Sequence, residues 1–341
     1  MATNTAGQPG RTPKPAAHPA AHEDREPGVA VTGAAGFLGR YVVARLHDQG
    51  HAVRVILRTP RRAALFAPLQ TSIRYADIRD RQAMASALEG CDRLIHCAAI
   101  ISEHGADTYQ SVNVEGVRAT YAAARDAGVR RAVHVNPIGA SPRASASYLR
   151  SRGEGEEAAR DSGVPMNVIR FSTLFGPGDA FLSVLAGLVR LGPIVPVAGS
   201  GKARFQPIHI EDAAEAAVRL LQEPWSGEIV EAGGPKIVSY DEILDEVANA
   251  LGRRIVKIHV PLAVMGPSER LMEALFPQPP ITTNELGMLK LDNVVAPDAP
   301  RGNYASDPRP LAGNLDYLQG VRFLDGVRIM FGRMPAHIRD H

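Results

Sequence analysis

The sequence predicts an α/β protein built on a doubly wound parallel sheet. Short apolar runs alternate with helical stretches from residue 29 onward, at the spacing of βαβ units. A glycine-rich turn joins the first apolar run to the first helix, as parallel α/β folds often require. The chain has 341 residues, which is enough for one large domain or two modest ones with a sizeable core.

The expected elements follow one another in regular order. The first helix, at 36–49, has Phe37, Leu38, Tyr41, Val42 and Leu46 on one face and ends at Gly50. A helix rich in Ala and Leu is expected between the second and third strands. In all, we expect strands at 29–32, 52–57, 73–75, 93–98, 132–135 and 167–170, and further helices at 82–88, 112–127 and 148–161.

The pattern changes after residue 175, where Gly, Pro and apolar residues dominate as far as residue 202. We expect a helix at 180–190, returning strands at 206–210 and 228–231, and a helix between them at 212–221. Ser239 and Glu242 have the spacing of a capping box ahead of a further helix. The expected domains are a dinucleotide-binding domain at 27–175, with returning strands about 203–235, and a smaller α+β substrate or partner region at 176–202 and 236–335.

Composition excludes several classes of protein. The net charge of +2 and the absence of a basic stripe argue against nucleic acid as a partner. Cys91 and Cys97 lack the spacing of a metal site, so we expect two reduced core thiols and no metal. Residues 1–26 contain no apolar run and are expected to form a disordered tail. With no secretory signal and no long apolar stretch, a cytoplasmic protein is expected.

The glycine turn predicts a Rossmann-type dinucleotide site. It reads Gly33-Ala34-Ala35-Gly36-Phe37-Leu38-Gly39, directly after a strand and at the start of a helix. In this pattern the first glycine permits a tight turn, the second lets the backbone approach a pyrophosphate, and the third allows close packing of helix on strand. The phosphates then meet the amides and the positive end of the helix dipole.

The end of the second strand favours NADP(H) over NAD(H). An NAD site has Asp or Glu there, bonded to the ribose 2′-hydroxyl, whereas this strand ends Leu57-Arg58-Thr59-Pro60. Arg58 is expected to bind a 2′-phosphate, and Arg61 and Arg62 are expected to be solvated residues at a helix start.

Three further positions are expected to border the cofactor. Asp77, followed by Ile78, could accept a hydrogen bond from the adenine amino group, and it could equally be a helix N-cap. The small residues Ala98 and Ala99 end the fourth strand, where the cofactor can lie against the backbone.

Several motifs together resemble the extended and atypical short-chain dehydrogenase/reductases, which include proteins of the NAD-dependent epimerase/dehydratase type. They are the glycine turn, Asp77-Ile78-Arg79-Asp80, His96-Cys97-Ala98-Ala99, Asn113-Val114-Glu115-Gly116, Tyr148 and Phe175-Gly176-Pro177-Gly178-Asp179. The stretches 147–156, 204–209 and 231–235 resemble one atypical branch, which contains the NADPH-binding accessory subunit of respiratory complex I and its bacterial relatives. The resemblance covers residues 29 to about 295 and weakens after residue 252.

The resemblance implies a catalytic tyrosine, a lysine four residues later and a serine at the end of the fifth strand. In this chain Tyr148 is present, Arg152 stands at the lysine position, and Asn136 stands at the serine position. Arginine keeps the charge but does not release a proton, and an amide can donate a hydrogen bond but cannot relay a proton. Ser141 and Ser145 lie between Asn136 and Tyr148 as potential substitutes.

Three interpretations are therefore open. The cofactor is mainly structural or regulatory; or the protein is an active NADP-dependent reductase, dehydratase or epimerase with an altered triad, acting on a small, isoprenoid or sugar-type substrate; or it is an NADP(H)-sensing scaffold. The partner classes that remain are the dinucleotide, another protein, a peripheral respiratory complex and a membrane surface, with a membrane-peripheral location in the last two cases.

The C-terminal region adds two weaker expectations. Met265, Leu271, Met272, Leu275 and Phe276 could line a substrate pocket or contact a partner, with core packing as the default. Residues 317–328 alternate apolar and basic side chains and suggest a basic amphipathic helix, which Gly320 and Gly326 weaken.

Overall fold

The computed structural model describes residues 28–261, 292–297, 307–330 and 335–339. It contains the expected doubly wound sheet, in which neighbouring strands pair in parallel. In spatial order the seven strands are β11 (Ile229–Ala232), β6 (Met166–Phe171), β5 (Arg131–Pro137), β4 (Cys91–His96), β1 (Gly28–Thr32), β2 (Val53–Leu57) and β3 (Ser72–Tyr75). The strand order reverses between β1 and β4, and in open α/β sheets ligands bind at the carboxyl edge beside such a reversal.

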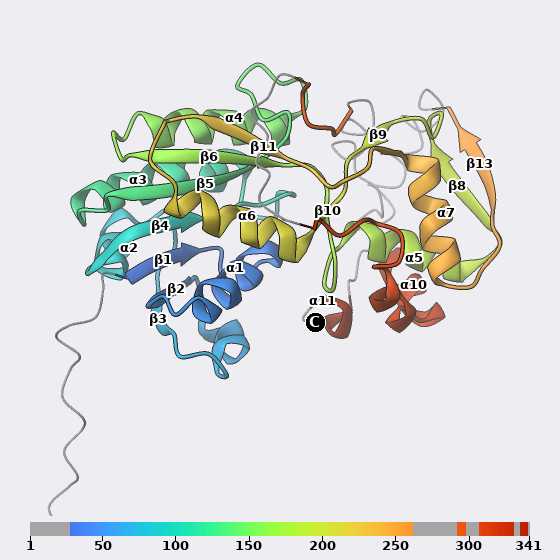
Figure 1. Ribbon diagram of the computed structural model, residues 1–341, viewed down its shortest axis with the longest axis horizontal. Helices are drawn as coiled ribbons and strands as arrows, with labels where there is room; N and C mark the ends of the chain where they lie inside the picture. Colours follow the sequence, from blue (N-terminus) through green and yellow to red (C-terminus); the bar gives the residue numbers. More distant parts are fainter. Residues whose placement is uncertain (1–27, 262–291, 298–306, 331–334, 340–341) are drawn as a thin grey trace, which may run out of the picture.

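Helices cover both faces of this sheet (Figure 1). On one face, α1 (Phe37–Asp48) packs beside α6 (Ile210–Gln222) over a core of mainly Val, Ile, Leu and Ala side chains. On the other face lie α2 (Arg81–Leu88), α3 (Val117–Asp126) and α4 (Ser147–Arg160). The side chains of the inner strands therefore alternate between two buried layers, which explains why these strands read as apolar runs, whereas the edge strand β3 is largely exposed.

A second group of elements lies beside the carboxyl edge of the sheet (Figure 1). It contains α5 (Phe181–Leu191), β8 (Ile194–Ala198), α7 (Tyr240–Ala250), β13 (Val256–Val260), the 3₁₀ helix η3 (Asp316–Gly320), α10 (Phe323–Met330) and α11 (Ala336–Arg339). Two short pairings lie between this lobe and the sheet: β7 (Leu174–Phe175) with β10 (Ile208–His209), and β9 (Arg204–Phe205) with β12 (Val238–Ser239). The lobe has its own apolar core.

Most of the expected elements are present, with some differences in and beside the sheet. The segment after β2 is a 3₁₀ helix, η1 (Pro60–Phe66), rather than an α-helix. The helix expected at 112–127 begins as a π-helix, η2 (Tyr109–Gly116), before α3. Of the two expected returning strands, β11 joins the central sheet and β10 pairs with β7 instead. The capping box of Ser239 and Glu242 is formed.

The stretch at 317–328, expected to form one amphipathic helix, is helical in two separate pieces. The chain forms η3 and then α10, and Leu318 and Val321 are buried in the lobe. A Cβ on Gly326 would lie 2.6 Å from the carbonyl oxygen of Gly187, so this glycine allows α10 to pack closely on α5. The apolar cluster expected at 265–276 and the tail at 1–26 lie outside the described residues.

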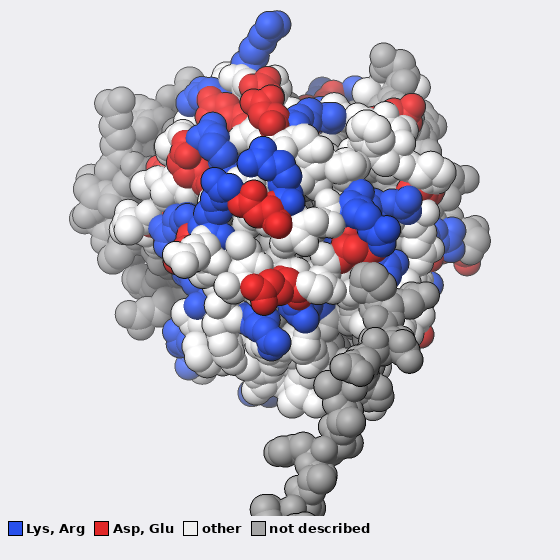
Figure 2. Space-filling model, turned by 90° about the vertical axis from the view of Figure 1, so that its left-hand side faces the viewer, with Lys and Arg blue, Asp and Glu red and all other residues white. Residues whose placement is uncertain are grey.

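The surface in Figure 2 carries Lys and Arg side chains interspersed with Asp and Glu, with no extended region of one sign. This face is the left-hand end of the molecule in Figure 1. Within the described ranges, no helix is both long enough and apolar enough to cross a membrane.

Candidate dinucleotide site

The glycine turn lies at the carboxyl end of β1, beside the end of β4. Gly33 has a φ of +65°, and a Cβ at this position would lie 2.6 Å from the backbone nitrogen of Ala98. A Cβ on Gly39 would overlap the Gly33 carbonyl oxygen, so both glycines are required by the backbone itself.

Gly36 differs from these two glycines. It precedes α1 without a side-chain cap, and a Cβ there would meet only the Gly33 carbonyl oxygen, at 3.0 Å. No side chain caps the first amides of this twelve-residue helix. The uncapped helix start forms a cradle with the donors that a pyrophosphate needs.

The other residues of the turn are placed by the adjacent helix and strands. Leu38, in the first turn of α1, is buried, and Phe37 packs edge-on against Tyr41 with ring centroids 6.2 Å apart. Arg62 is not the solvated residue expected from the sequence, because its Nη1 donates to the Ala35 carbonyl oxygen at 2.6 Å. Arg62 thus connects η1 to the glycine turn.

Arg58 follows β2, one strand from the glycine turn, and its side chain is 56% exposed. Its Nη1 lies 2.6 Å from Oδ2 of Asp107, which comes from the loop after β4. Asp107 also lies 3.1 Å from Nη1 of Arg79, so one carboxylate holds two guanidinium groups at this edge.

Asp77 belongs to the same cluster. It accepts from Nη2 of Arg79 at 2.6 Å and from the Arg79 backbone amide at 3.0 Å, and these bonds hold the pKa of its carboxyl below the usual value. The expectation that Asp77 could cap a helix is wrong, because Asp80 caps α2 by accepting from the Ala83 amide. The side chain of Ile78, the next residue, packs against Gly116 so closely that a Cβ on Gly116 would collide with it.

β4 ends at His96, so Ala98 and Ala99 lie in the loop beyond Cys97 and do not end the strand as expected. Ala98 provides the backbone that closes on Gly33, and Ala99 is exposed. Cys97, beside them, is a free thiol whose burial raises its pKa to about 12, so it is not a nucleophile near neutral pH. Cys91 is likewise a free, buried thiol.

Helix α4 carries the Tyr148 and Arg152 pair. Tyr148 is half-buried, and its ring lies 6.0 Å from that of Tyr109. Burial raises the pKa of Tyr148, and the charge of Arg152 opposes that rise. Arg152 is 4% exposed, and its Nη2 donates to the carbonyl oxygen of Val135.

Two nitrogens of Arg152, Nε and Nη1, are buried without a hydrogen-bond partner among the described residues. A buried guanidinium with unused donors is costly unless a ligand or water completes it. The cradle at Gly36, the cation at Arg58 and the unused donors of Arg152 together fit a nicotinamide dinucleotide.

Asn136 is buried, and its amide nitrogen is bonded within the protein. It lies at the end of β5, 2% exposed, and its Nδ2 donates to Oε2 of Glu156 at 2.7 Å and more weakly to the Arg152 carbonyl oxygen at 3.4 Å. Glu156 also binds Arg170, with Oε2 to Nη2 at 3.0 Å. The expected donor at the serine position is therefore already engaged inside the protein. Ser141 accepts from the Arg143 amide, and Ser145 is exposed.

A buried polar cluster lies under the site, between the sheet and α3. Thr32 Oγ1 and His96 Nδ1 are 2.8 Å apart, the rings of His96 and His134 stack at 5.3 Å, and the Tyr121 hydroxyl lies 3.2 Å from His134 Nδ1. Burial lowers the pKa of His96 to about 3 and that of His134 well below its usual value, so both rings are neutral.

Sequence reasoning missed Asp107 altogether, and it missed the contacts that Glu156 and Arg62 make with Asn136 and Ala35, since these partners lie far apart in the chain. Asn113 carried a detectable signal, because it lies in the motif Asn113-Val114-Glu115-Gly116. Its side chain bonds the amide and carbonyl of Ile100 at 2.9 and 3.0 Å and donates to Ser151 at 3.1 Å. The π-helical turn around Asn113 thus connects the loop after β4 to α4.

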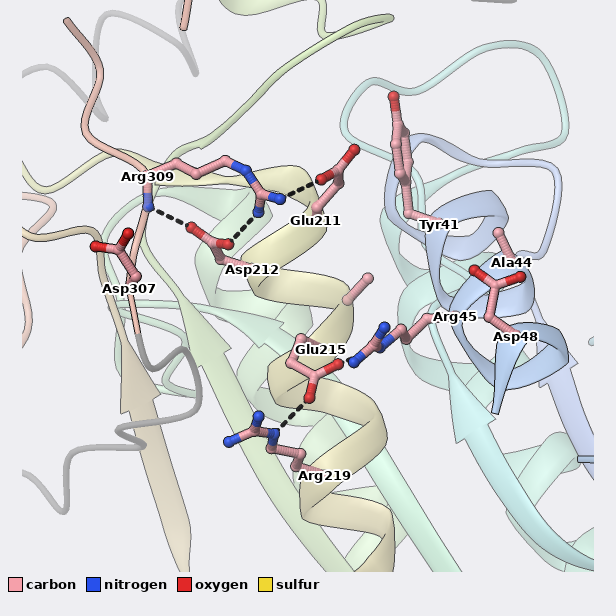
Figure 3. A pocket seen from close by; sticks show the side chains of 11 residues that line it. Tyr41, Ala44, Arg45, Asp48, Glu211, Asp212, Glu215, Arg219, Asp307 and Arg309 are labelled. Atoms are coloured by element: carbon pink, nitrogen blue, oxygen red, sulfur yellow. Dashed lines mark hydrogen bonds and ion pairs between the residues drawn. The ribbon is translucent and has the colours of Figure 1, made fainter. Parts of the chain in front are cut away.

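A separate groove of about 620 Å³ runs between α1 and α6 (Figure 3). Arg45 and Arg219 both pair with Glu215, and Arg309 pairs with Asp212 at 2.5 Å. None of its lining residues belongs to the glycine turn or to the ends of β4 and β5, so the groove is distinct from the dinucleotide site. Among the described residues, no group of three or more His, Cys, Asp or Glu side chains could hold a metal ion.

The fold and the glycine turn define a doubly wound Rossmann-type protein. Residues 29–233 match the model of the NAD dependent epimerase/dehydratase family, and the chain belongs to that family. Members of this family bind a nicotinamide dinucleotide.

Two relatives and two solved structures illustrate the similarity. The chain is 31% identical over 235 residues to the ceramide reductase of Caulobacter vibrioides, covering 68% of this chain and 73% of that protein. It is 26% identical over 285 residues to the mitochondrial NADH dehydrogenase [ubiquinone] 1 alpha subcomplex subunit 9 of Arabidopsis thaliana, covering 79% and 71%.

Both solved structures are more distant in sequence. The crystal structure of gox2253 has a TM-score of 0.68 at 23% identity, covering 91% of this chain and 100% of that one. A UDP-glucose 4-epimerase from Thermus thermophilus, solved in complex with NAD, has a TM-score of 0.58 at 20% identity, covering 76% and 96%. At these identities the likeness extends to the fold alone.

Proposed function

We propose that this protein binds NADP(H) in preference to NAD(H) and keeps it mainly as a structural or regulatory ligand. The observation that carries the proposal is the engagement of Asn136, whose amide nitrogen donates to the buried carboxylate of Glu156 at 2.7 Å. Loss of one oxyanion-type donor reduces enzymatic rates by on the order of a hundredfold or more.

The proposed cofactor site uses the residues expected from the sequence. The amides at the start of α1, after Gly36, would hold the pyrophosphate, with Gly33, Ala35, Phe37, Leu38 and Gly39 forming the turn. Arg58 would bind the 2′-phosphate; Asp77, Ile78, Ala98 and Ala99 would border the adenine and the backbone face; and Tyr148 and Arg152 would contact the nicotinamide ribose. When bound, the reduced cofactor would supply a hydride.

A second candidate function is reduction of a carbonyl in an apolar, lipid-like substrate. It is favoured by the 31% identity to a protein named ceramide reductase and by the Tyr148 and Arg152 pair. In this case Tyr148 would donate the proton and Arg152 would orient the nicotinamide ribose, without help from Asn136.

The third interpretation, an NADP(H)-sensing scaffold, draws on the relatives named as respiratory complex subunits. We propose that the region at 176–202 and 236–335 would then contact a protein, a peripheral respiratory complex or a membrane surface, with the protein in the cytoplasm or at the membrane periphery. Exposed apolar side chains in this region, such as Phe323, Leu324, Ile194 and Val256, support a contact surface there.

Calorimetric titration with NADPH and with NADH tests the cofactor proposal. The unmodified chain should bind NADPH more tightly, and Arg58→Ala should lower NADPH affinity roughly tenfold or more, as loss of a charge-assisted bond does, and leave NADH affinity nearly unchanged. Gly36→Val should fold yet bind neither cofactor, because its side chain would fill the cradle. Tighter binding of NADH, or no loss in Arg58→Ala, would refute the NADP(H) assignment.

A further inference from the structure

The end of β2 lacks a carboxylate, but the fold brings one from elsewhere in the chain to the part of the proposed cofactor site that would hold the adenine ribose. Asp107 lies 49 residues from Arg58 in the chain, yet its Oδ2 is 2.6 Å from Arg58 Nη1. An acidic group therefore stands beside the cation that the 2′-phosphate would use.

Asp107 is held in this position by the backbone around it. His104 and Asp107 exchange two backbone hydrogen bonds, of 2.9 and 3.0 Å, and Thr108 forms a capping box at the start of η2. The Asp107 side chain is 24% exposed, against 56% for Arg58. The carboxylate is thus the anchored member of the pair, and the guanidinium is the member with freedom to turn.

We propose that Asp107 is a specificity-determining residue, which competes with the 2′-phosphate for Arg58 and so limits the preference for NADP(H). The inference rests on the proposed function, since it concerns the same cofactor site. A 2′-phosphate carries up to two negative charges and would be repelled by the Asp107 carboxylate. A ribose 2′-hydroxyl is a hydrogen-bond donor that the same carboxylate can accept.

A purely structural role for Asp107 has a different signature. Asp107 also pairs with Arg79 at 3.1 Å, so the ion pairs could simply brace the loop against the end of β3. Loss of such structural support would lower the affinities for both cofactors equally and lower the melting temperature. Competition changes the ratio of the two affinities, because only the 2′-phosphate meets the carboxylate.

The experiment titrates the full chain and Asp107→Asn with NADPH and NADH, and with the fragments 2′,5′-ADP and 5′-ADP. In Asp107→Asn, the preference for the phosphorylated member of each pair should rise roughly tenfold at low salt, the effect expected of one nearby unit charge, and rise less at high salt. Asp107→Glu, which retains the charge, should stay near the original ratio.

The controls separate the possible outcomes. Asp126→Asn removes a similar exposed ion pair, with Arg81 at 2.5 Å, and should change neither affinity. In the Arg58→Ala background, Asp107→Asn should raise the preference less, because the competition for the guanidinium is already gone and only the direct repulsion of the 2′-phosphate remains to be relieved. An unchanged ratio, or an equal loss for both cofactors, would overturn the role of Asp107. If the unmodified chain binds neither cofactor, the proposed function itself fails.

Discussion

Arg152 places a buried guanidinium one helical turn from Tyr148. It retains the positive charge that opposes the burial-driven rise in the Tyr148 pKa, but a guanidinium does not exchange protons at accessible pH. Burial also lowers the pKa of Arg152, and the acidic groups around it, foremost the Tyr148 hydroxyl, oppose that change. The tyrosine thus has electrostatic support without a proton relay.

Restoring the two altered positions should therefore reveal whether they limit activity. We expect weak NADPH oxidation by the unmodified protein on a panel of carbonyl compounds, and a gain in Asn136→Ser combined with Arg152→Lys, because serine and lysine restore the relay. The measurement is the decrease in NADPH absorbance, with Tyr148→Phe in each background as the control. High turnover of the unmodified protein that collapses in Tyr148→Phe would instead establish the reductase interpretation.

At the scale of elements, the sequence predicted what local periodicity encodes. The βαβ order and the glycine turn follow from apolar runs and glycine spacing, and both are present in the structure. The π-helical start at η2 could not be predicted, because it depends on Asn113 bonding Ile100 and Ser151 in other segments. The partners of Arg58 and Asn136 lie 49 and 20 residues away, so only the folded chain brings them together.

The connection between β7 and α5 holds a buried carboxylate. Asp179 is 2% exposed, accepts from the amides of Gly176, Leu182 and Ser183, and is bonded by the hydroxyl of Tyr317 in η3. Burial raises the pKa of Asp179 to about 6, although these hydrogen bonds oppose the rise. The group joins the start of α5 to the C-terminal segment.

This raised pKa predicts a pH effect on stability. Between about pH 4 and pH 6, folded Asp179 binds more proton than the unfolded chain, so its contribution to the free energy of unfolding falls as pH rises. The loss amounts to at most about 3 kcal/mol for a shift of two pKa units. Urea unfolding from pH 4 to pH 7 should show the free energy of unfolding of Asp179→Asn rising relative to that of the unmodified chain, because the variant lacks the contribution that falls with pH. Asp161→Asn, at an exposed position, is the control, and parallel profiles for Asp179→Asn and the unmodified chain would contradict the assignment.

At the scale of the whole molecule, helix α1 connects the glycine turn to the smaller lobe. It begins after Gly36, and in its first turns Arg40 Nη2 and the Tyr41 hydroxyl donate to the carbonyl oxygen of Pro177 at 3.0 and 2.9 Å. Pro177 lies two residues before Asp179, which holds the amides at the start of α5. Two sets of hydrogen bonds, from α1 to Pro177 and from the α5 amides to Asp179, therefore link a ligand on the turn to the lobe.

We accordingly expect NADPH to stabilise both parts of the molecule. A ligand at a hundred times its dissociation constant adds about 2.7 kcal/mol to the free energy of unfolding if only the folded state binds it.

Amide hydrogen exchange should slow at the glycine turn and also at Leu182 and Ser183. Because the Tyr41 hydroxyl carries part of the connection, Tyr41→Phe should reduce the protection of these two amides more than that of the turn. Tyr75→Phe, at an exposed position of β3, should change neither. Protection confined to the turn in the unmodified chain would show that the lobe does not respond to the cofactor, and an unmoved melting curve at saturating NADPH would contradict a structural role for it.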